Sequence, residues 1–152
     1  MTVSGVHRLT SRVLLFDRDH RILLFLTTAP DTSRVARWIT PGGGVDAGES
    51  HHDAAVRELF EETGLVITDL GAAVWSHDFT VAWNDADHDT GHAEFFTAVT
   101  DAFEPSDAHW TADERVDVLD HKWWTLTELL NTTEPYEPAE LISLVRRQLP
   151  SC

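Results

Sequence analysis

The chain has 152 residues, of which 42% are apolar, and a formal net charge of −15. This length and composition indicate one globular domain, residues 1–152, with a core of its own. The charge argues against nonspecific binding to nucleic acid, which needs a basic surface. No apolar run approaches the roughly 18 residues of a membrane helix, and residues 1–13 lack an apolar signal core. We therefore expect a cytoplasmic protein with neither a membrane nor nucleic acid as its partner.

The first elements of the chain are predicted to be strands. Residues 11–28, "SRVLLFDRDHRILLFLTT", predict a strand, a turn and a second strand, because "DRDH" separates two apolar runs. A polar loop is expected over residues 29–37. Residues 38–44, "WITPGGG", predict a short strand that runs into a glycine turn.

Residues 51–63 are predicted to form a helix. Ser50 can cap its N-terminus, with Asp53 three residues on, and Gly64 stands where a left-handed C-terminal cap occurs. The spacing of apolar residues marks a buried stripe along this helix. Its members are Val56, Leu59, Phe60 and Thr63.

Three glutamates gather near the end of this helix: Glu58, Glu61 and Glu62. At about 100° per residue, they are expected to lie nearly opposite the buried stripe. Like charges at this spacing destabilise a helix by roughly 0.2–0.5 kcal/mol per pair, and acids in the last turn oppose the helix dipole by roughly 0.3–1 kcal/mol each. A solvated acidic face is one explanation for this octet, "RELFEETG", and a functional site is the other.

The second half of the chain predicts further strands and short helices. We expect one or two strands in residues 65–83, an acidic loop over residues 84–92, and strands at 93–100 and 118–126. Residues 104–117 are expected to be a loop with one helical turn. Two helices are predicted, one from residue 126 and one over residues 137–149, with Pro138 in the first turn of the latter. Hairpins with interspersed helices indicate an α/β or α+β fold with a mixed sheet.

Glycines concentrate just before and after the predicted helix of residues 51–63. Five of the eight glycines fall between residues 42 and 64. The glycine turn predicted before the helix lets the backbone come close to a ligand. The turn also brings Glu49 to the start of the helix, where it can pair with Arg57 and orient the other acids. Carboxylates and a backbone carbonyl are the oxygen ligands that Mg²⁺ or Mn²⁺ prefers.

Residues 43–65, "GGVDAGESHHDAAVRELFEETGL", resemble the Nudix box, the signature of the Nudix hydrolases. Every fixed position of that pattern is met, by Gly43, Glu49, Arg57, Glu58, Leu59, Glu61, Glu62, Gly64 and Leu65. The resemblance implies the Nudix fold, an α/β/α sandwich with a mixed β-sheet, in which the box forms a loop, a helix and a loop.

The resemblance also implies a reaction. Members of the family cleave the pyrophosphate bond of a nucleoside diphosphate linked to another group: water attacks one phosphorus, and divalent ions neutralise the charge on the bridging and leaving oxygens. Glu58, Glu61, Glu62 and a backbone carbonyl near Gly43 would be ligands of Mg²⁺ or Mn²⁺. Arg57 and Glu49 would hold this catalytic constellation in place.

Candidate residues outside the box are less specific. The general base is a box glutamate or a later acid, and we consider Glu94, Glu114 and Asp120. Arg34 and Arg37 are candidates for binding a phosphate or ribose, and Trp38, Trp75 and Trp83 for stacking on a base. Solvent-facing loops or core packing explain each of these residues as well. The histidines, including His77 and His92, match no zinc motif in their spacing, so a surface position or core packing explains them best.

The sequence does not assign a substrate within the family. A (deoxy)nucleoside triphosphate, normal or oxidised, suits a short chain without an added domain, whereas ADP-ribose, a nucleotide sugar and a dinucleoside polyphosphate are alternatives. A small-molecule nucleotide is thus the expected partner, and a homodimer agrees with the frequent dimers of the family. Two other classes are a Nudix-fold binding module without catalysis, which the intact box opposes, and a calcium-binding protein, which the absence of an EF-hand loop opposes.

Overall fold

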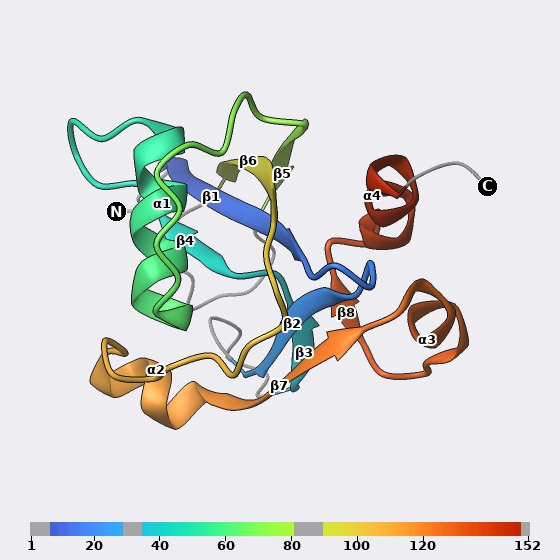
Figure 1. The fold of residues 1–152 in the computed structure, drawn as a ribbon. Coiled ribbons are helices and arrows are strands. Elements are labelled where there is room, and N and C mark those ends of the chain that lie inside the picture. Colours follow the sequence, from blue (N-terminus) through green and yellow to red (C-terminus); the bar gives the residue numbers. More distant parts are fainter. Residues whose placement is uncertain (1–6, 29–34, 81–89, 150–152) are drawn as a thin grey trace.

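A computed structural model describes residues 7–28, 35–80 and 90–149. One mixed sheet lies between helix α1 on one side and helices α3 and α4 on the other (Figure 1). In chain order, the elements are β1 (His7–Phe16), β2 (Ile22–Thr27), β3 (Arg37–Ile39), β4 (Gly42–Gly44), α1 (His51–Thr63), β5 (Trp75–Thr80), β6 (Thr90–Val99), α2 (Ala112–Asp117), β7 (Val118–Trp124), α3 (Leu126–Asn131), β8 (Tyr136–Glu137) and α4 (Leu141–Gln148). This architecture confirms the expected α+β fold with helices on both faces of a mixed sheet.

Strand β1 is the centre of the sheet. The strand order is β5-β6-β1-β2-β3-β8, while β4 pairs with β1 and β7 pairs with β2. Strands β1 and β6 are parallel over the whole length of β1, and β3 and β8 are also parallel, whereas the other pairs are antiparallel. On its other edge, β1 pairs with β4, so that Ser11 faces Gly43. The register of β1 thus places the glycine run beside α1.

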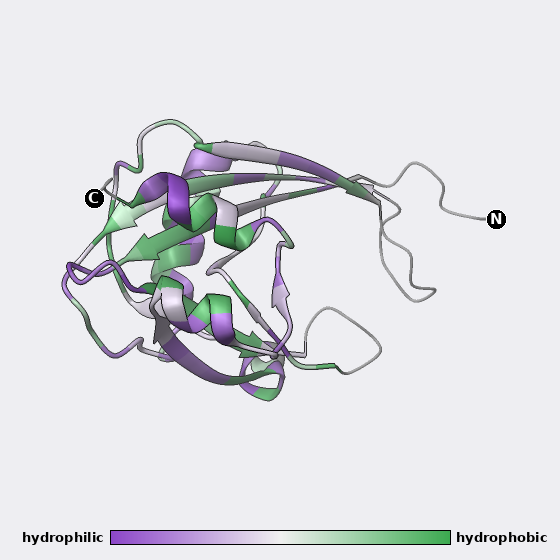
Figure 2. Ribbon diagram, turned by 90° about the vertical axis from the view of Figure 1, so that its right-hand side faces the viewer, coloured by the Kyte–Doolittle hydropathy of each residue, from purple (hydrophilic) through white to green (hydrophobic). Residues whose placement is uncertain are grey.

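Both faces of the sheet carry a hydrophobic core. Val13 and Leu15 of β1 belong to the core beneath α1, whereas Leu14 and Phe16 belong to the core beneath α3 and α4. Side chains alternate between the faces of a strand, so a strand covered on both sides is apolar throughout. This explains the continuous apolar runs of β1 and β2, and Figure 2 shows that the helices contain both hydrophobic and hydrophilic residues.

Helix α1 begins and ends where the sequence predicts. The Asp53 amide donates to Ser50 Oγ at 3.1 Å, and Gly64, with φ 81°, donates its amide to the Phe60 carbonyl at 2.7 Å. The buried stripe differs from the prediction, because the buried residues are Ala54, Ala55, Leu59 and Thr63. Val56 and Phe60 are only partly buried. The two alanines allow α1 to approach the sheet closely, and the helix is rotated toward them.

Several other predictions need correction. The glycine run forms strand β4 rather than a turn, and one strand, β5, lies in the described part of residues 65–83. Leu65, Ile67 and Leu70 pack on the core beneath α1 without pairing to a strand. Most of the acidic loop, residues 84–89, and much of the polar loop, residues 29–34, lie outside the described residues.

The last helix starts later than predicted. Helix α4 begins at Leu141, so Pro138 precedes it rather than lying in its first turn. Glu137 belongs to the unpredicted strand β8 and forms an ion pair with Arg37 of β3 at 3.0 Å. A residue before proline favours the extended conformation, which fits the strand. Within the described residues, α1 is the longest helix with 13 residues, and no helix has the length and apolarity of a membrane span.

Candidate functional site

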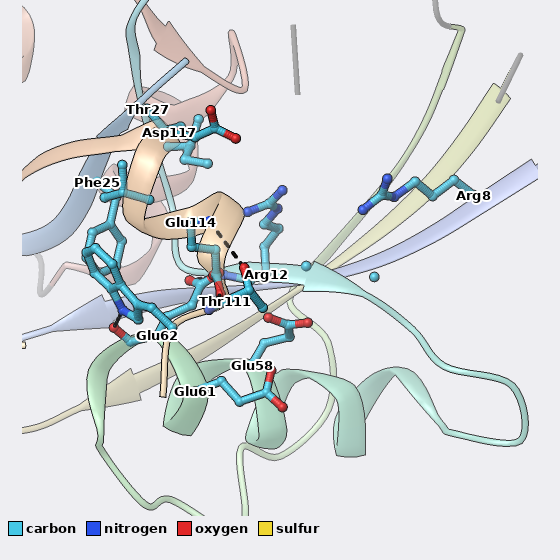
Figure 3. A pocket seen from close by; sticks show the side chains of 16 residues that line it. Arg8, Arg12, Phe25, Thr27, Glu58, Glu61, Glu62, Thr111, Glu114 and Asp117 are labelled. Atoms are coloured by element: carbon cyan, nitrogen blue, oxygen red, sulfur yellow. Dashed lines mark hydrogen bonds between the residues drawn. The ribbon is translucent and has the colours of Figure 1, made fainter. Parts of the chain in front are cut away.

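A cavity of about 410 Å³ opens beside the second half of α1 (Figure 3). Strands β1, β2, β3, β4 and β7 and helices α1 and α2 contribute to its wall. The lining residues are Arg8, Arg12, Phe25, Thr27, Ile39, Gly42, Gly43, Gly44, Glu58, Glu61, Glu62, Trp110, Thr111, Glu114, Asp117 and Val118. All three box glutamates therefore share one pocket, and Figure 3 shows Glu58 extending from α1 toward Arg12, whereas Glu61 lies along α1.

The orientation of α1 turns two of the glutamates toward the sheet. At about 100° per residue, the angular positions of Glu58 and Glu62 fall between those of the buried Ala54 and Leu59. The expectation that these acids lie nearly opposite the buried stripe is therefore wrong for Glu58 and Glu62. The side chain of Glu58 is only 13% exposed. Glu61 lies nearer the rim of the pocket, with 38% of its side chain exposed.

The glycines of β4 make room for Glu58. A Cβ atom added to Gly43 would lie 2.7 Å from the Glu58 carboxyl carbon, which is closer than real Cβ contacts. Gly43 faces Ser11 in β1, so pairing between the strands holds this backbone in place. Only a residue without a side chain leaves both the strand pairing and the Glu58 carboxylate in position.

Arg57 connects the glycine segment to the acids. Its guanidinium forms two hydrogen bonds with Glu49, from Nε to Oε2 and from Nη2 to Oε1, both at 2.9 Å. Nη2 also donates to the Gly44 carbonyl at 2.8 Å, and Nη1 donates to Glu58 at 3.0 Å and to Glu61 at 3.2 Å. One side chain thus orients two of the pocket carboxylates and one backbone carbonyl.

The pairing of Arg57 with Glu49 favours the charged forms of both groups. Hydrogen bonds from Arg57, followed by one from the Asp46 amide, lower the pKa of Glu49 to about 2. The hydrogen bonds to Glu49 raise the pKa of Arg57. Charge-assisted bidentate pairs of this kind are stronger than neutral hydrogen bonds and fix both planes.

The inner carboxylates are poorly compensated. Burial raises the pKa of Glu58, and burial raises the pKa of Glu62 well above its usual range, although Arg12 and the Gly42 amide act against that rise. The Gly42 amide donates to Glu62 Oε2 at 2.9 Å. Arg12 donates a hydrogen bond from Nη1 to the Thr40 carbonyl at 3.0 Å, and burial lowers the pKa of Arg12. The pocket thus contains carboxylates that lack a full counter-charge.

This donor set suits a hard divalent cation. The box glutamates supply carboxylate oxygens, the β4 glycines supply a close backbone, and the incomplete charge compensation favours an added cation. The residues therefore fit Mg²⁺ or Mn²⁺. Among the described residues, the three glutamate carboxylates are not gathered within 4.8 Å of one another, and Arg57 instead holds Glu58 and Glu61.

Two residues after α1 complete the pocket. Trp110 donates its Nε1 hydrogen to the Glu62 carbonyl at 2.8 Å, at the end of α1 where carbonyls lack helical partners. Glu114 lines the same pocket and forms a capping box with Thr111 at the start of α2. The structure thereby brings the candidate base Glu114 to the box glutamates.

The remaining candidates lie elsewhere. Glu94 is on β6, outside this pocket, and Asp120 is exposed and accepts the His121 amide at 2.8 Å. Trp38 is 5% exposed and packs edge-on against Trp124 in the core. This burial places Trp38 in the core, whereas Arg34 and Trp83 lie outside the described residues.

A second cavity of about 470 Å³ contains Arg37. Arg37 is 6% exposed, and Tyr136, Phe79 and His77 contribute to the same wall. The two cavities share their lining residues Arg8, Arg12 and Ile39. The pocket with the glutamates therefore adjoins a more aromatic one.

Three functional candidates were not predicted from the sequence: Arg8, Arg12 and Trp110. Arg12 had a weak signal, since it is a charged residue in a predicted strand, directly before the apolar run of residues 13–16. Arg8 and Trp110 had none, because their approach to the pocket depends on the pairing of β1 and on the path of residues 100–111.

Comparison with known proteins links this arrangement to a family. The family model described as the NUDIX domain matches residues 6–145. The uncharacterized Nudix hydrolase YvcI of Bacillus subtilis is 33% identical over 98 residues, which are 64% of this chain and 56% of that protein. A putative 8-oxo-dGTP diphosphatase of Bacillus subtilis is 63% identical over 52 residues, or 34% of this chain and 32% of that protein. An RNA pyrophosphohydrolase of Sphingopyxis alaskensis is 46% identical over 59 residues, which are 39% of this chain and 35% of that protein.

The aligned part is limited for these relatives. The chain spans 56% of the first and about a third of the other two. Among solved structures, the MutT protein from Methanosarcina mazei Go1 superposes with a TM-score of 0.69, covering 96% of this chain and 95% of that chain at 19% identity. This likeness concerns the fold alone.

Proposed function

The chain belongs to the Nudix hydrolase family, and we propose that it hydrolyses the pyrophosphate bond of a nucleoside triphosphate with Mg²⁺ or Mn²⁺ as its cofactor. The observation that carries this proposal is the Arg57 cluster, in which one guanidinium contacts Glu49, Glu58, Glu61 and the Gly44 carbonyl beside a pocket. Such a cluster positions carboxylates for chemistry, whereas a solvated acidic face needs no such support.

The pocket residues have proposed roles, and Glu61 is a candidate for two of them, metal ligand and general base. Glu58, Glu61, Glu62 and the backbone near Gly43 would hold the divalent ions, and Arg57 and Glu49 would keep them oriented. When bound, the ions supply neutralisation of charge on the phosphate oxygens. Arg8 and Arg12 approach from β1 (Figure 3), and their guanidinium groups would bind phosphate oxygens.

The proton acceptor is proposed to lie within the same pocket. The side chain of Glu61 is 38% exposed, against 13% for Glu58, so water can reach it. Glu114 is the other acid on the wall that the sequence suggested. Glu94 is outside the pocket, and the geometry favours Glu61 and Glu114 over it as a general base.

The adjoining cavity supports a nucleotide as the substrate. Its aromatic wall includes Phe79 and Tyr136, which suit a base, and the buried Arg37, paired with Glu137, lies at the same wall. The lining residues Arg8 and Arg12 belong to both cavities. A nucleoside in the second cavity would thus place its phosphates in the first.

An oxidised or normal (deoxy)nucleoside triphosphate is our preferred substrate. The short, highly similar segment shared with a putative 8-oxo-dGTP diphosphatase supports it. The second candidate is the 5′-triphosphate end of RNA, which the likeness to an RNA pyrophosphohydrolase favours. The net charge of −15 opposes a polyanion. ADP-ribose, nucleotide sugars and dinucleoside polyphosphates remain alternatives of the same reaction, and a non-catalytic module is the alternative of another class.

A substrate panel tests this proposal. Reaction products would be separated by chromatography, with Mg²⁺ and Mn²⁺, for dNTPs, 8-oxo-dGTP, 5′-triphosphorylated RNA, ADP-ribose, NADH, nucleotide sugars and dinucleoside polyphosphates. The triphosphates release pyrophosphate or phosphate, whereas the other substrates split into two phosphorylated fragments. We expect turnover of one or more triphosphates and a loss of about 100-fold or more in kcat for Glu61→Gln. Glu104→Gln, an exposed acid outside the pocket, is the matched control and should keep wild-type turnover. An unreduced rate in Glu61→Gln would refute the role of Glu61 in catalysis, whether as metal ligand or as general base. Absence of turnover for every substrate in the panel would favour the non-catalytic module.

A further inference from the structure

A second group of potential metal ligands lies outside the catalytic pocket. It consists of His51, the first residue of α1, and His92 and Glu94 of β6. None of the three lines either cavity. His51 precedes Glu58 by seven residues, which is about 10 Å along the helix axis. The group is therefore separate from the box glutamates.

Sheet register brings these side chains to one place. His92 and Glu94 are two residues apart on β6 and share one face of the sheet. Phe96, two residues further on, belongs to the core beneath α1, so this face is the one that α1 covers. The parallel pairing of β1 with β6 sets Ser11 beside Glu94, and Ser11 also contacts the start of α1, with Oγ 2.8 Å from the His51 carbonyl.

The ligand atoms converge. Glu94 Oε2 lies 3.1 Å from His92 Nε2 and 3.7 Å from His51 Nε2, and all the ligand atoms lie within 4.8 Å of one another. Bond lengths of about 2.0–2.2 Å in a tetrahedral zinc site place ligand atoms about 3.3 Å apart. Small side-chain adjustments therefore suffice for all three to contact one ion.

The other ring nitrogens are held as they are in known metal sites. His51 Nδ1 is 3.1 Å from the Thr10 carbonyl and 3.0 Å from Ser11 Oγ. Because a carbonyl only accepts, Nδ1 carries a hydrogen in this contact, and Nε2 is the nitrogen that a metal ion would take. His92 Nδ1 is 2.7 Å from the Asp78 carboxylate. Carboxylate or carbonyl partners on the far nitrogen orient metal-binding histidines and raise their basicity.

The donor set selects the class of ion. Two imidazole nitrogens and one carboxylate suit Zn²⁺ and its neighbours, such as Co²⁺, better than Mg²⁺. The side chains are 17%, 26% and 29% exposed for His51, His92 and Glu94, so an ion can enter from solvent. The helix dipole opposes a cation at the start of α1, but the carboxylates of Glu94 and Asp78 act against it.

We propose that His51, His92 and Glu94 form a binding site for a Zn²⁺-class transition-metal ion, separate from the Mg²⁺ or Mn²⁺ site of the box glutamates. The site has three protein ligands and leaves a fourth position for water or another donor. A bound ion would link the start of α1 to β6 and so brace the helix that carries the box. The proposal does not depend on the proposed substrate.

Metal binding itself is the test. The full chain, freed of metal with a chelator, would be dialysed against Zn²⁺ or Co²⁺ in a large excess of Mg²⁺, which competes for the oxygen-ligand site. We expect one Zn²⁺ per chain by elemental mass spectrometry, and Co²⁺ absorption bands of a nitrogen- and oxygen-coordinated ion. His51→Gln and His92→Gln should each weaken binding at least 10-fold.

Two further variants make the result decisive. His121→Gln is the matched control, because His121 also contacts a glutamate, Glu104, at 3.1 Å, and it should bind Zn²⁺ as the wild type does. Glu94→Gln retains the size of the side chain and decides the matter if a histidine variant fails to fold by circular dichroism. No Zn²⁺ in the wild type would overturn the proposal and leave a hydrogen-bonded network of Asp78, His92 and Glu94. An equal loss of Zn²⁺ binding in His121→Gln would also overturn the proposal. So would unchanged Zn²⁺ binding in Glu94→Gln and in the folded histidine variants.

Discussion

Arg57 shows how a single side chain organises the pocket. Its five donor hydrogens form a planar fork, and they reach Glu49, Glu58, Glu61 and the Gly44 carbonyl. The fork neutralises part of the charge that the glutamates bring to the end of α1. The pairing with Glu49 in particular fixes the orientation of the Arg57 guanidinium among these carboxylates.

The contribution of Glu49 to stability should depend on pH. Its pKa is lowered to about 2 from the ordinary 4.5, first by Arg57 and then by the Asp46 amide. A lowered folded-state pKa stabilises the fold fully above the unfolded-state pKa, and the effect declines as the pH falls from about 4.5 through about 2. We expect Glu49→Gln to reduce the free energy of unfolding by about 1–2 kcal/mol at pH 7, with a smaller difference below pH 4.

Urea denaturation of both proteins from pH 7 down to the lowest pH at which they fold measures this difference. Glu134→Gln, at an exposed position, is the control and should show little change at any pH. A difference for Glu49→Gln that grows as the pH falls would contradict the assigned ion pair.

Strand β4 consists of glycines, whose lack of side chains lets neighbouring atoms approach its backbone closely. Gly42 faces Arg12 and Gly43 faces Ser11, and a side chain added at each glycine would meet a different neighbour. A Cβ on Gly42, whose φ is 150°, would lie 2.2 Å from the Ser11 carbonyl oxygen, which is backbone. A Cβ on Gly43 would meet the end of the Glu58 side chain, which can rotate. The same element thus contains one position that the fold needs and one that the site needs.

Alanine at each position should separate these two requirements. We expect Gly42→Ala to destabilise the fold by about 2–4 kcal/mol, because backbone must shift. Gly43→Ala should change the melting temperature little but lower kcat at least 10-fold, because the Glu58 carboxylate is displaced. Thermal denaturation and the triphosphate assay measure both effects. Loss of stability without loss of specific activity in Gly43→Ala would show that this glycine serves packing only.

At the scale of the whole molecule, the acidic pocket should make stability depend on divalent cations. A ligand that binds only the folded state stabilises it by mass action, by about 2.7 kcal/mol at 100 times its dissociation constant. For a domain of this size, this raises the melting temperature by roughly 5–10 °C. We expect such a rise as Mg²⁺ or Mn²⁺ is added to the millimolar range.

A chain with a net charge of −15 also gains stability from any salt, so NaCl at matched ionic strength must be the reference. Glu61→Gln should show a clearly smaller rise with Mg²⁺ than the wild type, whereas Glu104→Gln should match the wild type. An equal rise with NaCl and Mg²⁺ would mean that screening, and not a site, is responsible.

Local signals allowed much of the fold to be predicted. Ser50 and Gly64 mark the ends of α1 because caps act within a few residues, and the apolar runs of β1 and β2 indicate strands for the same reason. The rotation of α1 could not be predicted, since Ala54 and Ala55 are weak signals alone and become decisive only against the glycines of β4. The start of α4 was missed because β8 depends on pairing with β3, a hundred residues away.

The sequence by itself determined the box and the ends of its helix, since nine residues at set spacing and two caps are properties of one short segment. Tertiary structure alone decided which side of that helix faces the sheet, that Arg8, Arg12 and Trp110 reach the pocket, and that His51 meets His92 and Glu94. The physical reason is range. Helix caps and spacing act over a few residues, whereas strand register joins residues some 30 to 80 positions apart, and no local pattern records which of them will meet.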